Sequence, residues 1–248
     1  MIPPAGIEPG KNDLFYNESH DAWRQELRKF VSKEIVPFVE EWEEAGEFSR
    51  ELYKKAGEFG LLGMGYPEKY GGTSEGIDIF HGIVTSEELA QGCGGVAASL
   101  LSLNISLPLI MALGTEEQKQ KYIPPVIAGE KIACLGVTEP SGGSDVAGIK
   151  TKAVRDGDHF IINGSKMFIT SGMRADYYVI ACRTGGPGTS GISAIVVEKG
   201  TPGFTQTSLK KMGWLSSDTA ALYFDDVRVP VENLIGGENS GWMGIMSN

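Results

Sequence analysis

One segment of the chain combines residue types that could hold an anionic or flat ligand. It is an apolar run that ends at a threonine and enters a loop dense in glycine and serine, Gly136-Val137-Thr138-Glu139-Pro140-Ser141-Gly142-Gly143-Ser144-Asp145-Val146-Ala147-Gly148. Backbone N–H groups and hydroxyls in such a loop can form a nest that holds a phosphate. An ordinary glycine-rich turn between strands has the same composition, so the segment alone leaves both interpretations open.

A second segment of the same kind follows, Met167-Phe168-Ile169-Thr170-Ser171-Gly172. Here too a predicted strand ends in a threonine hydroxyl, next to an aromatic ring. Two strand-end threonines and one aromatic ring could line a flat ligand and hydrogen-bond its heteroatoms. This signal is also weak when it is taken by itself.

Several other chemistries are disfavoured by the motifs that the sequence lacks. It has no GxGxxG or GxxxxGK[ST] nucleotide fingerprint and no GxSxG nucleophile elbow. The cysteines form neither a CxxC pair nor a disulfide framework, and the histidines share no metal-ligand spacing, so we expect no metal site and surface or partly buried histidines: Cys93, Cys134, Cys182, His20, His81 and His159.

The composition is that of a globular protein. The 248 residues, 41% hydrophobic and 22% charged, allow one large domain or two modest ones. The net charge of -10 argues against a nucleic-acid partner; residues 1–131 hold 12 basic and 21 acidic side chains, and residues 132–248 hold 10 and 11. No stretch approaches the ~20 apolar residues of a membrane span, and Met1–Gly6 lacks targeting features. We expect a cytoplasmic protein without membrane insertion.

The elements that must position the two segments change character near residue 131. Before it, apolar residues follow helical spacing, with Pro37 as an interruption. We predict helices over 23–42, from Ser49 to Gly60, and over 77–91, 95–113 and 115 to about 124–129. After it, short strands are predicted at 132–138, 150–155, 159–163, 167–170, 177–183, 192–198 and 221–224. The residues 227–230 are predicted to lead into a last loop, and 241–248 to start a helix.

In this order and spacing the segments resemble the acyl-CoA dehydrogenase family. The resemblance also rests on Tyr70-Gly71-Gly72, Gly114-Thr115-Glu116-Glu117-Gln118-Lys119, Ile161-Ile162-Asn163-Gly164-Ser165-Lys166, Lys211-Met212-Gly213, Ser217-Asp218-Thr219 and Phe224-Asp225-Asp226-Val227-Arg228-Val229-Pro230. It implies an α+β fold: an all-α domain over 1–131, an antiparallel barrel-like β domain over 132–240, and at 241–248 the start of a C-terminal domain. The family's C-terminal four-helix bundle is then absent from these residues.

The resemblance implies noncovalent FAD against the β domain. The family places the cofactor at Leu135, Gly136, Val137, Thr138, Gly142, Gly143, Ser144, Phe168, Ile169 and Thr170. Thr138 would bond the pyrimidine side of the flavin through its main chain and hydroxyl, and Thr170 would lie near flavin N5. Phe168, where several relatives have tryptophan, would pack on the ring. Ser144 would also contact the thioester ligand.

The implied reaction, a step of fatty-acid β-oxidation, is α,β-dehydrogenation of an acyl-CoA to the trans-2-enoyl-CoA. A glutamate removes an α-proton, a β-hydride moves to flavin N5, and the electrons pass to an electron-transferring flavoprotein. The family's base is expected beyond Asn248, so no catalytic residue is assigned in this chain. Two alternatives stay open: an inert fragment that only binds ligand, and an oxygen-reducing relative of the acyl-CoA oxidase or flavin hydroxylase type. Family members are usually homotetramers, and the length or branching of the acyl chain stays open.

Overall fold

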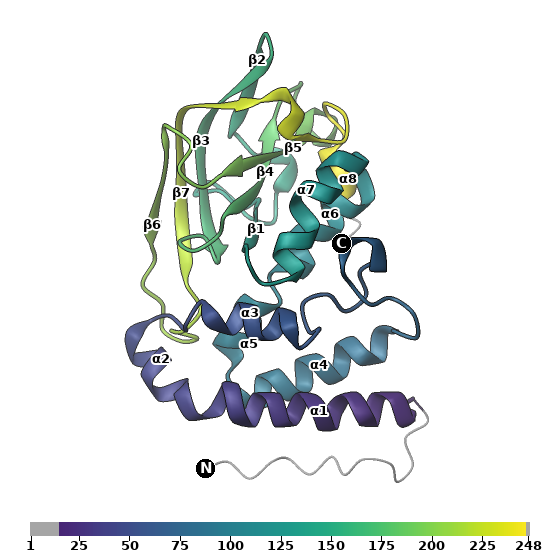
Figure 1. Cartoon of the computed structure of the whole chain (residues 1–248). Helices are drawn as coiled ribbons and strands as arrows, with labels where there is room; N and C mark the ends of the chain where they lie inside the picture. The colour runs from purple at the N-terminus through teal and green to yellow at the C-terminus, as the bar shows by residue number, and fades with distance from the viewer. Residues whose placement is uncertain (1–14, 247–248) are drawn as a thin grey trace.

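The computed structural model describes residues 15–246. The expectations for Met1–Gly6 and for Ser247 and Asn248 lie outside the described residues. Within them, a helical first half leads into a β-sheet second half, as predicted (Figure 1).

The first half contains the predicted helices. They are α1 (Glu18–Glu34), α2 (Val39–Ala45), α3 (Glu51–Glu58), α4 (Ile79–Gly92), α5 (Gly94–Leu100), α6 (Leu103–Leu113) and α7 (Glu116–Ile127). The interruption expected at Pro37 is confirmed, because a short 3-10 turn over Val36–Phe38 separates α1 from α2. The capping box of α7 is confirmed as well: Gln118 N–H donates to the Thr115 hydroxyl and Thr115 N–H donates to the Gln118 side chain.

The single helix predicted over 95–113 is wrong, because the chain breaks at Leu101 and Ser102 between α5 and α6. The expectation that no stretch approaches the length of a membrane span is also wrong: Gly94–Leu113 is long and apolar enough by length and composition. Half of it is buried inside the protein, with Leu107 and Leu109 fully enclosed. A core helix passes the same test, so the stretch is weak evidence for a membrane span.

The second half forms one curved sheet. Its strands are β1 (Ala133–Gly136), β2 (Lys152–Asp156), β3 (His159–Thr170), β4 (Tyr177–Arg183), β5 (Ile192–Glu198), β6 (Phe204–Ser208), β7 (Thr219–Pro230) and β8 (Leu234–Ile235). The order is β6-β7-β3-β2-β4-β5-β8, with β1 beside β4. The pairs are antiparallel except β1–β4 and the single β2–β4 pair, which are parallel. Tyr178 of β4 and Phe204 of β6 still touch, ring centroids 4.7 Å apart, so the sheet curls around a barrel-like core.

Two strand predictions were too short. The segments 159–163 and 167–170 belong to one strand, β3, and 221–224 is part of β7, which continues through 227–230, where the approach to a loop was expected. Gly164, with φ +145°, and Phe168, with φ +62°, sit at the two register shifts between β3 and β7. These bulges let the strand continue through turn-like residues. Strand β6 was not predicted.

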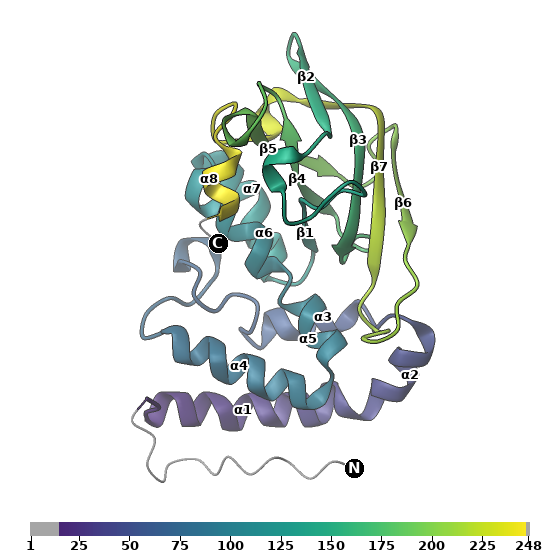
Figure 2. The same cartoon turned by 180° about the vertical axis from the view of Figure 1, so that it is seen from behind.

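Helices cover the sheet on one side. In Figures 1 and 2, α6, α7 and α8 (Gly241–Met246) lie beside the sheet, whereas α1 and α4 lie side by side at the opposite end of the molecule from the β2–β3 hairpin. The Gln118 side chain of α7 donates to the carbonyls of Glu232 and Leu234, both at 2.8 Å. Helices α6 and α7 thus pack with the β half, and a domain boundary at 131/132 stays a prediction.

Candidate functional site

The two segments that the sequence singled out meet where β1 ends. The N–H of Met167 in β3 donates to the carbonyl of Thr138, two residues past β1, over 2.8 Å. Because Phe168 follows Met167 directly, this bond places the strand-end threonine next to the aromatic residue. Leu135, Val137, Thr138 and Thr170 are half-buried, and Gly136 and Ile169 are buried.

The glycine-rich loop closes on itself after Thr138. Glu139 and Gly142 exchange two backbone hydrogen bonds of 3.1 Å, and Gly142–Ser144 are exposed. A methyl group at Gly142 would find nothing within 4 Å, so the space in front of it is open. Within residues 15–246 the amide groups of Thr138, Gly143 and Ser144 donate to no protein acceptor. The loop therefore keeps the N–H groups of Gly143 and Ser144 unpaired at exposed positions.

A strained turn presents the aromatic ring. Phe168 is 68% exposed and has φ +62°, and Ser171, which is buried, has φ +60°. Each such conformation costs of order 1 kcal/mol or more in a residue other than glycine. Ser171 N–H donates to the Asp218 carbonyl at 3.0 Å, and Met173 N–H donates to the Asp218 carboxylate at 2.8 Å. The structure thus holds a large apolar ring outward against its own backbone preference.

A buried ion pair lies beneath the loop. The Lys166 ammonium is fully buried and lies 2.9 Å from Oε1 of Glu139, whose own exposure is 5%. It also donates to the Val137 carbonyl at 3.0 Å. The Glu139 carboxylate accepts the N–H groups of Lys150 and Thr151 at 2.7 and 2.8 Å. The pair therefore ties the loop to β3 and to the chain before β2.

The electrostatics of this pair follow from its surroundings. Burial alone would raise the pKa of Glu139, but the bonds from Thr151, the charge of Lys166 and the N–H of Lys150 outweigh it and lower the pKa. Burial lowers the pKa of Lys166 despite the nearby carboxylate of Glu139. Through these contacts Glu139 fixes the shape of the loop. The burial of Lys166 was not predicted, because a lone lysine in a strand is normally solvent-exposed.

These features fit FAD, the group that the resemblance implies. An outward-facing ring and two half-buried hydroxyls suit the flat, mostly apolar flavin, and unpaired amides suit its oxygens and phosphates. The residues Leu135–Thr138, Gly142–Ser144 and Phe168–Thr170 lie on two adjoining chain segments. Their contacts with a cofactor and that of Ser144 with substrate stay predictions.

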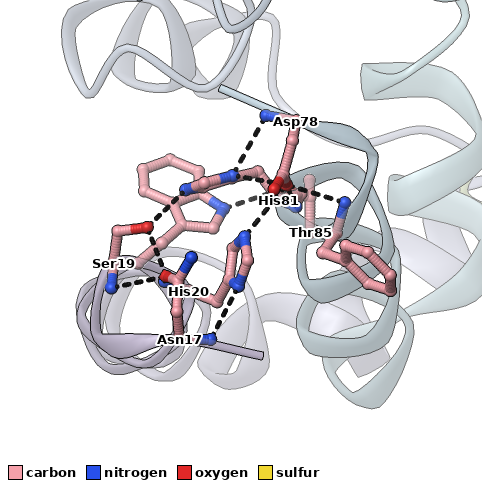
Figure 3. A network of polar contacts seen from close by, with 8 residues as sticks. Asn17, Ser19, His20, Asp78, His81 and Thr85 are labelled. Carbon is pink, nitrogen blue, oxygen red and sulfur yellow. Dashed lines mark hydrogen bonds and ion pairs between the residues drawn. The ribbon is translucent and has the colours of Figure 1, made fainter. Parts of the chain in front are cut away.

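A second polar cluster lies at the start of α1 and α4 (Figure 3). Spacing predicted no metal-ligand grouping, yet the fold brings His20, Asp78 and His81 together with one ligand atom of each within 4.8 Å of the others. Both histidines are buried, contrary to expectation. Sixty-one positions separate them, so local spacing carries no signal of this contact.

Both histidines of this cluster cap helices. The Nδ1 of His20 accepts the N–H of Asn17 at 3.0 Å, and the Nδ1 of His81 accepts the N–H of Asp78 at 3.3 Å. In His20 this bond uses the Nδ1 lone pair and places the ring proton on Nε2, which faces Oδ1 of Asp78 at 2.9 Å. The Nδ1 of His81 lies 3.0 Å from the same Asp78 oxygen as well as accepting the cap bond. A histidine that ligates a metal through Nε2 keeps its proton on Nδ1 and would lose its cap. The cluster is explained by capping, and we assign no metal to it.

Comparison with known proteins agrees with the resemblance. The family models for the acyl-CoA dehydrogenase N-terminal domain and middle domain match residues 17–130 and 134–227. The long-chain specific acyl-CoA dehydrogenase of Rattus norvegicus mitochondria is 44% identical over 236 residues, which cover 93% of this chain and 54% of that protein.

Solved structures extend the comparison to the fold. Acyl-CoA dehydrogenase from Geobacillus kaustophilus superposes with a TM-score of 0.90 at 42% identity, covering 95% of this chain and 63% of that one. Glutaryl-CoA dehydrogenase from Mycobacterium smegmatis, in complex with FADH2, gives 0.85 at 32% identity, covering 94% and 59%. The chain thus spans little more than half of the curated relative. The two matched domains, in this order and over most of its length, show that the chain belongs to the acyl-CoA dehydrogenase family.

Proposed function

We propose that this chain carries the flavin-facing part of an acyl-CoA dehydrogenase that oxidises an acyl-CoA thioester to its trans-2-enoyl-CoA. The observation that carries the proposal is the meeting of the two segments at the Thr138–Met167 bond, with Phe168 exposed beside it. Bound FAD would supply the acceptor for the two electrons removed from the substrate. The chain's own residues would bind and orient the cofactor.

Each part of the site has a defined task in this proposal. The hydroxyls of Thr138 and Thr170 and the free amide of Thr138 hold the polar edge of the flavin. Phe168 packs on its ring and excludes water from one face. The amides of Gly143 and Ser144 hold phosphate oxygens, and Ser144 also reaches the thioester ligand.

No residue of this chain is assigned as the base that removes the α-proton. Glu139 is the only carboxylate in the loop motif that is buried, and its oxygens are committed to Lys166 and to two backbone N–H groups. Its lowered pKa makes it a poor proton acceptor near neutral pH. We propose that the base comes from the part of the family fold that follows the middle domain. An electron-transferring flavoprotein as acceptor, a homotetramer and a cytoplasmic location complete the proposal by family resemblance.

The proposal is tested by titrating the purified 248-residue chain with FAD and following flavin absorbance and fluorescence. We expect binding, and a loss of affinity of about tenfold in Thr138→Val, the scale of one or two hydrogen bonds. Thr207→Val, on the exposed surface of β6, is the matched control and should bind like the wild type. A chain that is folded but has no affinity for FAD would overturn the proposal.

Turnover separates the alternatives. A dehydrogenase that contains this chain and its C-terminal helices should carry a yellow flavin that acyl-CoA bleaches without oxygen. Peroxide formed in step with acyl-CoA consumption would support the oxidase alternative instead. Product formed by the 248-residue chain alone would exclude the inert fragment and would contradict our placement of the base. A panel of acyl-CoA chain lengths in the same assay defines the substrate.

A further inference from the structure

The buried ammonium of Lys166 contacts the peptide group that joins Val137 to Thr138, one of the residues proposed to hold the flavin. Its Nζ lies 3.0 Å from the Val137 carbonyl and 2.9 Å from Oε1 of Glu139, with none of the side chain exposed. The Val137 carbonyl and the Thr138 N–H belong to one planar amide. That N–H has no acceptor among residues 15–246. One end of the amide is therefore bound to a buried cation while its other end is free.

A charged donor on a carbonyl changes the other end of the same amide. Hydrogen bonds with an ionised partner are about twice as strong as neutral ones, and bonds in series polarise one another. The ammonium draws electron density toward the Val137 oxygen, which makes the Thr138 N–H a stronger donor. The effect is large in this place because burial keeps water from screening the charge.

We propose that Lys166 is a positioning residue that strengthens the Thr138 N–H as a donor to the flavin and so raises the reduction potential of the bound cofactor, while Glu139 limits the rise. This inference rests on the proposed function. A reduced flavin carries more negative charge on its ring than an oxidised one, so a stronger donor binds the reduced form more tightly. The carboxylate of Glu139 neutralises part of the field and holds the loop in register through Lys150 and Thr151.

The two members of the pair should shift the potential in opposite directions. Lys166→Met removes the cation and should weaken the binding of reduced relative to oxidised flavin about tenfold, which lowers the potential by ~30 mV for a two-electron couple. Glu139→Gln leaves the cation unneutralised and should raise the potential. A pair that only shaped the loop would shift both variants in the same direction. Lys152→Met, an exposed lysine on β2, is the matched control and should leave the potential unchanged.

Each single variant leaves a buried charge without its partner and can fail to fold. The double variant K166M/E139Q removes both charges. We expect it to fold, to bind FAD and to show the lowered potential of Lys166→Met, because the ammonium on the Val137 carbonyl is missing in both. A double variant with the wild-type potential would overturn the inference.

A second measurement needs no cofactor and separates this inference from the proposed function. The amide ¹⁵N and ¹H resonances of Thr138 report polarisation of its peptide group. Lys166→Met and the double variant should move them upfield, and Lys152→Met should not. If the wild-type chain fails to bind FAD, the proposed function fails, whereas the resonance still tests the polarisation. An unchanged Thr138 resonance in both variants that lack Lys166 would refute it.

Discussion

Glu88 in the helical half and Glu139 in the β half are both buried carboxylates beside buried cations, but they bond to different groups. The Glu88 carboxylate of α4 accepts hydrogen bonds from the guanidinium groups of Arg24 and Arg28 of α1, at 2.7 to 3.1 Å. The Glu139 carboxylate accepts hydrogen bonds from the Lys166 ammonium and from two backbone N–H groups of the segment that follows the loop. The first arrangement joins two helices. The second fixes the backbone of an exposed loop, so the partner of a buried charge indicates its task.

The largest expected effect breaks the helical pair. Glu88→Ala leaves Arg24, which is 3% exposed, without its buried partner, and should lower the free energy of unfolding by about 3–5 kcal/mol. Glu87→Ala, the next residue on α4, removes a partner of Arg24 that is 30% exposed and should cost about 1 kcal/mol or less. Urea unfolding measures both. Equal losses would contradict the assignment, as would a folded Glu88→Ala protein with altered FAD affinity.

The next largest effect distinguishes a glycine that is needed for packing from a glycine that is needed for FAD binding. A methyl group at Gly136 would lie 2.6 Å from Cδ1 of Ile180, so Gly136→Ala should cost about 1–3 kcal/mol. Gly142 has open space in front of it, and Gly142→Ala should keep the unfolding midpoint while it weakens FAD binding. Thermal unfolding and FAD titration test the pair. FAD binding to Gly142→Ala at wild-type strength would place the flavin elsewhere.

The N-cap of α1 offers a comparison far from the loop, because its loss should lower stability without changing FAD binding. Asn17 accepts the N–H groups of Ser19 and His20 at the start of α1. Asn17→Ala should lower the free energy of unfolding by about 1 kcal/mol, as is usual for an N-cap, with FAD affinity unchanged. Chemical denaturation of the apo chain and FAD titration decide this, and a change in affinity would join two regions that we hold to be independent.

The smallest expected effect is on the pH dependence of stability, to which two buried carboxylates of the β half, Asp218 and Glu139, should contribute in opposite ways. Burial raises the pKa of Asp218, more than the Met173 N–H and the charge of Arg174 lower it, whereas the pKa of Glu139 is lowered. A raised carboxyl pKa means that stability falls as pH rises from the unfolded-state pKa to the folded one. A lowered pKa means that stability is lost as pH falls through the folded pKa.

Asp218→Asn should therefore stabilise the protein near neutral pH by under about 1 kcal/mol, the scale of one hydrogen bond, and the gain should vanish in acid. Glu139→Gln should instead destabilise the protein near neutral pH, and this loss of stability should also shrink in acid. Unfolding curves between pH 3 and 8 for the two variants and the wild type measure this. Gains or losses of the same sign in both variants would contradict it.

Much of the fold follows from the sequence because its signals are local. The capping box at Thr115 and the strand end at Thr170 sit where their patterns predict, whereas β1 ends at Gly136, two residues before the predicted end at Thr138. Strand β3 was cut short, because Gly164 and Phe168 look like chain breaks and act as bulges. The burial of Lys166 and the meeting of His20 with His81 depend on long-range packing, which no local pattern contains.

We propose above all that the flavin binds at the end of β1 and the turn of β3, away from the cluster of His20, Asp78 and His81. Amide chemical shifts of the 248-residue chain, recorded with and without FAD, test this most directly. We predict changes at 135–138, 142–144 and 168–170 and unchanged resonances at His20, Asp78 and His81. Changes confined to the start of α1 and α4, or none at saturating FAD, would contradict the account.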